Sequence, residues 1–426
     1  MSLGSIGSDI RYVLPASYDS VPQAFKSNSS AKPIACVLQT VNVPSLTTSA
    51  NASGTSIVQL PCGASAGIML NPYLRFDVTM AGGGNDSVFS FKGTTKSATA
   101  CINNYTTYIN SMQIDNIQNA DRVYDQIFAH GCSNDWVRQD SSILQHSGLL
   151  QTATGATYDL GSMCVPLLGL LGSQQGIPLY LFNGTLQINI TWNSLARAIF
   201  QSAGTALTGF QISNVQLIYD RIAVEQAFAD KVKMDMMSGA KYVLGYTNFQ
   251  NTTLAMAGAA SSPNFQYGLN VSSLRAVVAD TVLLPSTLAN AGLSVANGLT
   301  QFQVSLDGRL VNNNLLSAAR YPVVFAELQK CYSRLFDASV TDWASLVSGA
   351  DGAGVGTNNF TNGAWAVGVS TTRCNEALAF AGSPVSVCGI QATNVGGDAG
   401  GATMFITFIS DMQLLVDASG AVEIVR

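Results

Sequence analysis

Apolar and polar residues alternate with a period of two in many short stretches of the chain. In residues 186–190, Leu-Gln-Ile-Asn-Ile, every second side chain is apolar. This alternation is typical of a strand with one face on a core and the other in solvent. Segments of this kind predict strands at 34–43, 56–60, 73–80, 87–91, 105–114, 186–192, 211–222, 241–249, 274–284, 302–306, 364–370, 377–381, 404–410, 412–417 and 421–425. Many strands separated by glycine-rich loops predict an all-β sandwich fold.

Two segments have the periodicity of a helix instead. In residues 119–131 the apolar side chains fall at i, i+1, i+4 and i+5, with Asn119 as a candidate N-cap and Gly131 as a candidate stop. In residues 322–336 the apolar side chains share one face, and Pro322 suits a first helical turn. Each predicted helix follows a strand and a polar turn. The same strand–turn–helix unit therefore occurs in both halves of the chain.

The second half of the chain also echoes the first at an offset of about 200 residues. The matching pairs, in chain order, are 74–78 with 274–278, 124–128 with 327–331, and 216–220 with 413–417. A period of this size is that of a domain, far longer than the roughly 20–50 residues of solenoid or propeller repeats. The echo predicts one strand-rich domain used twice, and 426 residues suffice for two such cores.

The composition limits which side chains can form the solvent-exposed surface of this chain. Charged residues make up 11% of it, against about 25% in a typical soluble protein. Hydrophobic residues make up 47%, and the mean hydropathy is +0.24. A solvated monomer usually keeps charges of both signs on its surface. The exposed surface must therefore consist of uncharged polar side chains or lie against neighbouring subunits, which favours a protein that works in an assembly.

Charge and hydropathy argue against two kinds of partner. The formal net charge is −5, and residues 1–32 hold three basic and two acidic side chains, which is not a basic arm for phosphates. We therefore expect no direct nucleic-acid binding. No run of about 18 apolar residues occurs, and the start of the sequence lacks the basic and apolar regions of a signal peptide. We expect neither a transmembrane helix nor secretion.

The sequence offers little catalytic chemistry. Residues 63–67 match the G-x-S-x-G nucleophile elbow, but the residues that follow, through Pro72, cannot form the long helix that this motif needs. Of the two histidines, His130 suits a helix C-terminus as a cation, and His146 has no ligand partners nearby. The glycine-rich segments 352–356 and 396–401 lack the setting of a phosphate-binding loop. We expect no catalytic residue, no cofactor, no metal site and no enzyme activity.

The remaining reactive side chains fit structural roles. Asp121 and Asp125 suit the start of the first predicted helix, and together with Asp115 they form no calcium-binding sequence. The eight cysteines contain no C-x-x-C pair, which predicts buried reduced thiols instead of a zinc or redox site. The four tryptophans are expected in cores or interfaces. The polar connection 194–209 is expected to be a surface or inter-subunit loop.

Taken together, the two halves resemble a known family. Residues 72–78, 302–308 and 319–328 carry the resemblance, which extends from about residue 34 to residue 426. Tandem β-sandwiches of about 200 residues, each with an inserted helix, resemble the double jelly-roll major capsid proteins of adenoviruses, large DNA viruses, virophages and tailless membrane-containing phages. The resemblance implies an all-β fold of two eight-stranded jelly rolls. The implied parts are an N-terminal arm at 1–32, a first jelly roll at 33–225, a linker at 226–240 and a second jelly roll at 241–426.

The resemblance also implies a structural function, that of a major capsid protein located in the virion. Homotrimers would form pseudo-hexagonal capsomers of an icosahedral shell. The implied partners are the other two copies, neighbouring capsomers, minor capsid or penton proteins, and an internal membrane. From the residues alone two other classes stay open. One is a secreted or surface-layer β-sandwich adhesin or carbohydrate-binding protein, and the other is a β-sandwich hydrolase, for which histidines and paired carboxylates are scarce.

Overall fold

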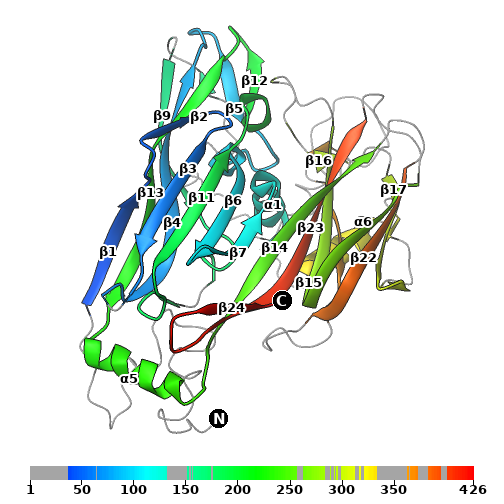
Figure 1. The fold of residues 1–426 in the computed structure, drawn as a ribbon. Coiled ribbons are helices and arrows are strands. Elements are labelled where there is room, and N and C mark those ends of the chain that lie inside the picture. The colour runs from blue at the N-terminus through cyan, green and yellow to red at the C-terminus, as the bar shows by residue number, and fades with distance from the viewer. Residues whose placement is uncertain are drawn as a thin grey trace.

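Antiparallel β-strands make up most of the molecule and form two bodies that lie side by side (Figure 1). The computed structural model describes residues 37–63, 65–131, 151–152, 155, 157–173, 176–256, 262–283, 288, 292, 294–295, 299–311, 316–317, 321–332, 362–363, 365–372, 382–394 and 401–426. The predicted arm, residues 1–32, lies outside them. Among the described residues no helix is long and apolar enough to span a membrane.

The first body is a β-sandwich. Its strands are β1 (Val37–Pro44), β2 (Ser49–Asn51), β3 (Thr55–Pro61), β4 (Ile68–Ala81), β5 (Val88–Phe91), β6 (Ile102–Ile109), β7 (Met112–Ile117), β8 (Gln151–Thr152), β9 (Thr157–Pro166), β10 (Ile177–Pro178), β11 (Thr185–Trp192), β12 (Ile199–Ala203) and β13 (Gly209–Ala223). One sheet has the order β1-β13-β4-β10, a second β3-β11-β6-β7, and a small one β12-β5-β8. Phe76 of β4 packs on Trp192 of β11 with ring centroids 5.0 Å apart, so the two main sheets share one core.

The second body is built on one continuous, folded sheet. Its strands are β14 (Tyr242–Met256), β15 (Asn264–Leu283), β16 (Ser294–Val295), β17 (Leu299–Leu306), β18 (Arg309–Leu310), β19 (Leu316–Ser317), β20 (Asn362–Gly363), β21 (Val367–Ser370), β22 (Ser383–Asn394), β23 (Ala402–Val416) and β24 (Val422–Val425). The main order is β14-β23-β15-β22-β17-β18. Strand β15 pairs with β22 through its first half and with β23 through its second, so one long strand joins the two groups of partners.

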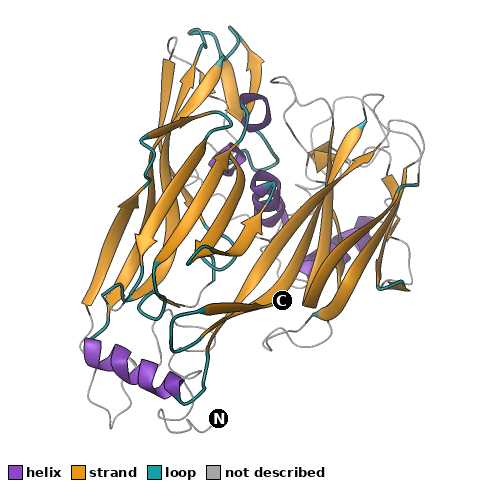
Figure 2. Cartoon of the chain, in the orientation of Figure 1, coloured by secondary structure: helices purple, strands orange, loops and turns teal. Residues whose placement is uncertain are grey.

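Both predicted helices are confirmed, with changes at their ends (Figure 2). Helix α1 (Ala120–Gln126) continues as a π-helix over Ile127–Gly131. Asn119 precedes α1 as predicted, but it has a left-handed φ of 49° and makes no capping hydrogen bond with its side chain. Helix α6 (Tyr321–Cys331) packs on β15 through Leu328 and Cys331. The residues predicted to extend this helix beyond 332 lie outside the described ones.

The predicted repeat is present in the strand order. In the first body β13 lies between β1 and β4, and in the second β23 lies between β14 and β15. The echoed segments 74–78 and 274–278 therefore fall on equivalent strands. Their register differs, however, because Leu74 pairs with Leu217 whereas Leu274 pairs with Ser410. The repeat is one of topology, and the residue-by-residue match along the strands is not kept.

Two strand predictions were wrong in how the segment divides into strands, and β14 and β15 are longer than the predicted 241–249 and 274–284. The strand predicted at 377–381 lies outside the described residues. The segment predicted as one strand at 105–114 is the hairpin β6–β7, because Asn110 and Ser111 adopt φ values of 50° and 67° and reverse the chain. The segments predicted as separate strands at 404–410 and 412–417 are the single strand β23. Asp411 does not interrupt it because Ser273 donates a hydrogen bond to its carboxylate, and Arg275 lies 3.6 Å away.

Three of the longer elements were not predicted from the sequence. Strands β9 and β22 contain small and polar residues that weaken the alternation, and they are held in the strand conformation by pairing with β4, β15 and β17. The segment 226–240, implied to be a linker, contains helix α5 (Gln226–Met237). Its buried side chains, Ala229, Val232 and Met236, lie at i, i+3 and i+7, which is a helical stripe.

The turn that enters β4 gives a first testable prediction. Gly67 has a φ of 72°, and a Cβ there would collide with the carbonyl oxygen of Ile222. We expect Gly67→Ala to lower the free energy of unfolding by about 2 kcal/mol or more, because both strain and overlap must be relieved by moving backbone. Gly245→Ala is the control, since a Cβ at Gly245 in β14 meets nothing within 4 Å. Equal effects in urea denaturation would contradict the prediction.

Candidate functional site

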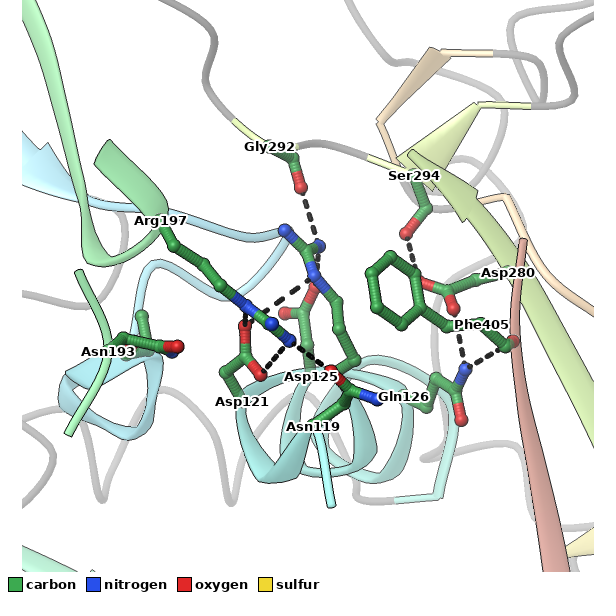
Figure 3. Close-up of polar contacts among 12 residues, drawn as sticks. Asn119, Asp121, Asp125, Gln126, Asn193, Arg197, Asp280, Gly292, Ser294 and Phe405 are labelled. Atoms are coloured by element: carbon green, nitrogen blue, oxygen red, sulfur yellow. Dashed lines mark hydrogen bonds and ion pairs between the residues drawn. The ribbon is translucent and has the colours of Figure 1, made fainter. Parts of the chain in front are cut away.

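The junction between the two bodies concentrates charge in a chain that has little of it. Helix α1 carries Asp121, Arg122, Asp125 and Gln126, all of them buried, and Asn119 precedes it (Figure 3). Charged groups removed from water are costly unless ion pairs and hydrogen bonds replace their hydration. Their partners therefore decide how the surrounding elements are placed.

Asp121 is held by a bidentate arginine. Arg197, in the short helix α4 (Leu195–Ala198), donates from Nε to one Asp121 oxygen at 2.9 Å and from Nη2 to the other at 2.7 Å. The same Nη2 donates to Asn119 Oδ1 at 2.8 Å. Asn119 Nδ2 in turn donates to Asn251 of β14 at 2.9 Å, which links this group to the second body. The fork geometry makes this the strong kind of charge-assisted contact.

Arg122 and Asp125 extend the network in two directions. Arg122 Nη1 donates to the carbonyl oxygen of Gly292 at 2.7 Å, and its guanidinium lies 3.8 Å from both Asp121 and Asp125. Asp125 accepts hydrogen bonds of 2.9 Å from the backbone N–H groups of Thr94 and Thr95. Arg122 therefore neutralises two carboxylates of the first body while it binds the backbone of the second.

Gln126 makes the most direct contact with the sheet of the second body. Its Nε2 donates to Asp280 of β15 at 2.6 Å and to the carbonyl oxygen of Phe405 at 3.5 Å. Ser294 donates to the other oxygen of Asp280 at 2.9 Å. The guanidinium groups of Arg122 and Arg197 each lie 5.6 Å from the centre of the Phe405 ring, within cation–π range. We use the name junction network for the buried groups on and before α1 together with their partners: Asn119, Asp121, Arg122, Asp125, Gln126, Thr94, Thr95, Arg197, Asn251, Asp280, Gly292, Ser294 and Phe405.

Burial shifts the pKa values of two groups at this junction. Burial is the main cause that raises the pKa of Asp280 to about 6, and Arg122 and the hydrogen bonds from Gln126 and Ser294 partly oppose it. Burial, followed by the neighbouring Arg122 charge, lowers the pKa of Lys92 to about 8. Both shifts favour the uncharged forms of groups that burial removes from water.

Asp115 lies apart from Asp121 and Asp125, although the three are close in sequence. Its Oδ2 accepts a hydrogen bond from Leu170 N at 2.8 Å, and its Oδ1 has no hydrogen-bond partner among the described residues. Burial raises the pKa of Asp115 to about 7. The proton that this carboxyl holds below that pH removes an otherwise uncompensated charge from the core of the first body.

Two of the candidate catalytic or ligand residues, His130 and Ser65, lie in the described part of the chain. His130 is buried, and burial lowers its pKa to about 4, so the predicted cationic role at the helix end is wrong: the imidazole is neutral near pH 7. Ser65 lies in a turn that leads straight into strand β4, so the G-x-S-x-G match has no helix after it. His146 and the glycine-rich segments 352–356 and 396–401 contain no described residue other than Gly401.

The described cysteines are free thiols, and they do not combine with histidines or carboxylates into a metal site. Three of these thiols are buried, namely Cys101, Cys331 and Cys388. Two are half-buried, namely Cys62 and Cys164. Cys36, Cys132 and Cys374 lie outside the described residues. Across the described part of the chain, no three His, Cys, Asp or Glu side chains are grouped so that they could hold a metal ion.

The sequence reasoning missed most of the junction network. Asp121 and Asp125 were both expected to stabilise the helix start through the helix dipole. Asp121 instead pairs mainly with Arg197. Asp125 instead accepts hydrogen bonds from the turn that contains Thr94 and Thr95. Residues 194–209 were expected to be a loop, but they contain α4 and β12. Arg197 of α4 is half-buried and anchors the junction through Asp121. One signal was available: three charges within five residues of a nearly uncharged chain mark 121–125 as unusual.

The repeated strand order and the inserted helices define a protein of two tandem jelly rolls. No family model and no curated protein matches the sequence. Solved structures do match it along nearly its whole length. They include the PBCV-1 virus capsid (TM-score 0.62, 12% identity, 94% of this chain and 99% of that one), the Faustovirus major capsid protein (0.60, 9%, 92% and 92%) and the mavirus major capsid protein (0.56, 12%, 96% and 96%). The chain has the double jelly-roll fold, as predicted.

The junction network gives a second prediction. Arg122→Met keeps most of the side-chain volume but removes this cation from Asp121 and Asp125, together with the hydrogen bond from Arg122 to the Gly292 carbonyl. We expect a loss of about 3 kcal/mol in the free energy of unfolding, because a broken buried ion pair leaves charges uncompensated. The two bodies should also separate into two unfolding transitions in guanidinium titrations followed by fluorescence.

Lys241→Met is the matched control for that variant. Lys241 pairs with Glu423 at 2.5 Å, but their side chains are 48% and 61% exposed. Pairs of this kind contribute about 1 kcal/mol or less. An effect of Arg122→Met no larger than that of Lys241→Met would show that the network does not hold the bodies together.

The pKa of Asp115 gives a third prediction. Its folded-state value of about 7 lies above the ordinary 3.8, so its contribution to stability is complete below about pH 4 and is lost as the pH rises through 7. The loss is on the order of 4 kcal/mol at most, at about 1.4 kcal/mol per pKa unit. Asp115→Asn should be more stable than the parent at pH 8 and less pH-dependent from pH 4 to 8. Parallel melting-temperature curves for the two proteins would disprove this role.

Proposed function

We propose that the chain is a major capsid protein of an icosahedral virus, and that three copies form a pseudo-hexagonal capsomer. The observation that carries the proposal is the end-to-end likeness to a virus capsid and two viral major capsid proteins, in which more than nine-tenths of each chain is covered. The proposed role is structural, not enzymatic, and the proposed location is the virion.

The arrangement of the two bodies supports a trimer. Each chain contributes two bodies with the same order of their three central strands, so three chains would place six similar bodies around one axis. We propose 33–225 and 241–426 as the two jelly rolls and 226–240 as the linker. The junction network would hold each pair of bodies in one orientation, which every position of a regular shell requires.

The composition of the exposed sheet faces supports burial between copies. On the outer face of β3 and β11, Gln59 donates to Gln187 at 2.8 Å, and Gln187 donates to Asn189 at 2.7 Å. Such amide rows bind water without charge. Covering them with a neighbouring subunit costs far less than covering charged side chains, because no ion has to be dehydrated.

The proposal includes further partners. Neighbouring capsomers and minor capsid or penton proteins would contact the rim of the trimer. Direct contact with the genome is not proposed, because the net charge is −5 and the first 32 residues carry no basic excess beyond one charge.

Light scattering behind size-exclusion chromatography tests the trimer. We expect three times the 44.7 kDa of the chain, about 134 kDa, at micromolar concentration. We also expect this mass to be the same at low and at molar salt, because uncharged surfaces are not screened. A stable 44.7 kDa monomer would refute the trimer, and a trimer that dissociates in molar salt would refute the uncharged interface.

A further inference from the structure

A polar pocket lies at the seam between the two bodies, apart from the charged groups of α1. Its volume is about 320 Å³, and residues of β7, β14 and β15 line it. Figure 1 shows β7 next to β14 near the C-terminus of the chain, and β15 belongs to the same sheet as β14. Small-molecule sites occupy roughly 300–1,000 Å³, so this pocket has room for one small ligand.

Carboxamide side chains dominate the lining. They come from both bodies, and they include Gln113, Gln118, Asn248, Gln250, Asn251 and Asn270. Each amide offers two N–H donors and an acceptor oxygen. Arg426, which is exposed, is the one charged side chain among the described residues that line the pocket. The pocket therefore presents donors and acceptors in similar number and very little charge.

Asn248 is the most buried amide of the lining, with 4% of its surface exposed. Its amide atoms are not fully enclosed, so water or a ligand in the pocket can reach them. A ligand that both donates and accepts hydrogen bonds can pair with this group.

The walls of the pocket are fixed before any ligand arrives. Asn251 accepts a hydrogen bond from Asn119 at 2.9 Å and donates one to Thr407 at 2.9 Å. The ring of Tyr267 stacks on Phe408 with centroids 5.1 Å apart and lies 6.1 Å from Phe265. Groups that are already ordered lose little entropy on binding. The pocket is therefore preorganised for a ligand.

We infer that this pocket binds a neutral sugar, one hexose unit of a free or protein-linked glycan. Adjacent hydroxyl groups of a hexose each donate and accept one hydrogen bond, which matches the carboxamide lining. A phosphate or another anion would find a single cation at the rim, and an apolar ligand would leave the amides unpaired. The inference is independent of the capsid proposal and would hold for a monomer as well.

Saturation-transfer NMR on the full chain tests the site. The probes are D-glucose, D-galactose, D-mannose and N-acetyl-D-glucosamine at millimolar concentration, with N-acetylneuraminic acid as an acidic sugar and glycerol as a small polyol. We expect transfer to at least one of the four neutral sugars and none to glycerol, which is too small to span the lining. Transfer to no neutral sugar, or to N-acetylneuraminic acid alone, would overturn the inference.

Two variants show whether the transfer comes from this pocket. A Cβ at Gly268 meets nothing within 4 Å, so Gly268→Leu should fill the pocket without disturbing β15 and abolish the transfer. Gly245→Leu is the matched control, because Gly245 is an equally open strand glycine that does not line the pocket. Asn248→Ala should weaken binding about tenfold, the equivalent of one hydrogen bond. Transfer that persists in Gly268→Leu, or is lost equally in Gly245→Leu, would overturn the assignment.

Discussion

The burial of charge along one face of α1 is the constraint on which the rest of the structure depends. Asp121, Arg122 and Asp125 are removed from water at the junction, and each charge is balanced only while partners from several elements stay in place. Arg122 must reach the Gly292 carbonyl, and Gln126 must reach Asp280. Contacts between domains usually permit relative motion unless the interface is large and apolar. Here directional bonds between buried groups restrict that motion instead.

Most of the fold could be predicted because alternation reports directly on a half-buried strand. Residues 186–190 alternate cleanly and form β11, whereas β9 contains Asp159, Gly161 and Ser162 and is a strand only because β4 pairs with it. The turn at Asn110 and Ser111 was invisible for a related reason. Its backbone needs positive φ at two residues, and serine gives no signal for that conformation. Such errors concern tertiary pairing and turn geometry, which local patterns do not contain.

The junction network was less predictable than the strands, because its partners are far apart in sequence. Arg197 meets Asp121 across 76 residues, and Gln126 meets Asp280 across 154. A sequence shows that Asp121, Arg122 and Asp125 are clustered, but it does not show what lies opposite them. Local electrostatics favoured the helix dipole as the explanation, and long-range ion pairing was the stronger effect. His130 was misjudged for the same reason, since burial and not the helix terminus sets its charge state.

Asn251 connects the two features of the seam. Its side chain accepts from Asn119 in the junction network and also lines the polar pocket, so one residue of β14 belongs to both. A ligand that hydrogen-bonds to Asn251 would therefore interact with the group that holds α1 against the second body. Binding at a seam stabilises the state in which both walls are present, because separated walls cannot bind. In a proposed capsomer built from rigid pairs of jelly rolls, occupancy of this pocket would thus favour the same orientation that the buried charges of α1 already impose.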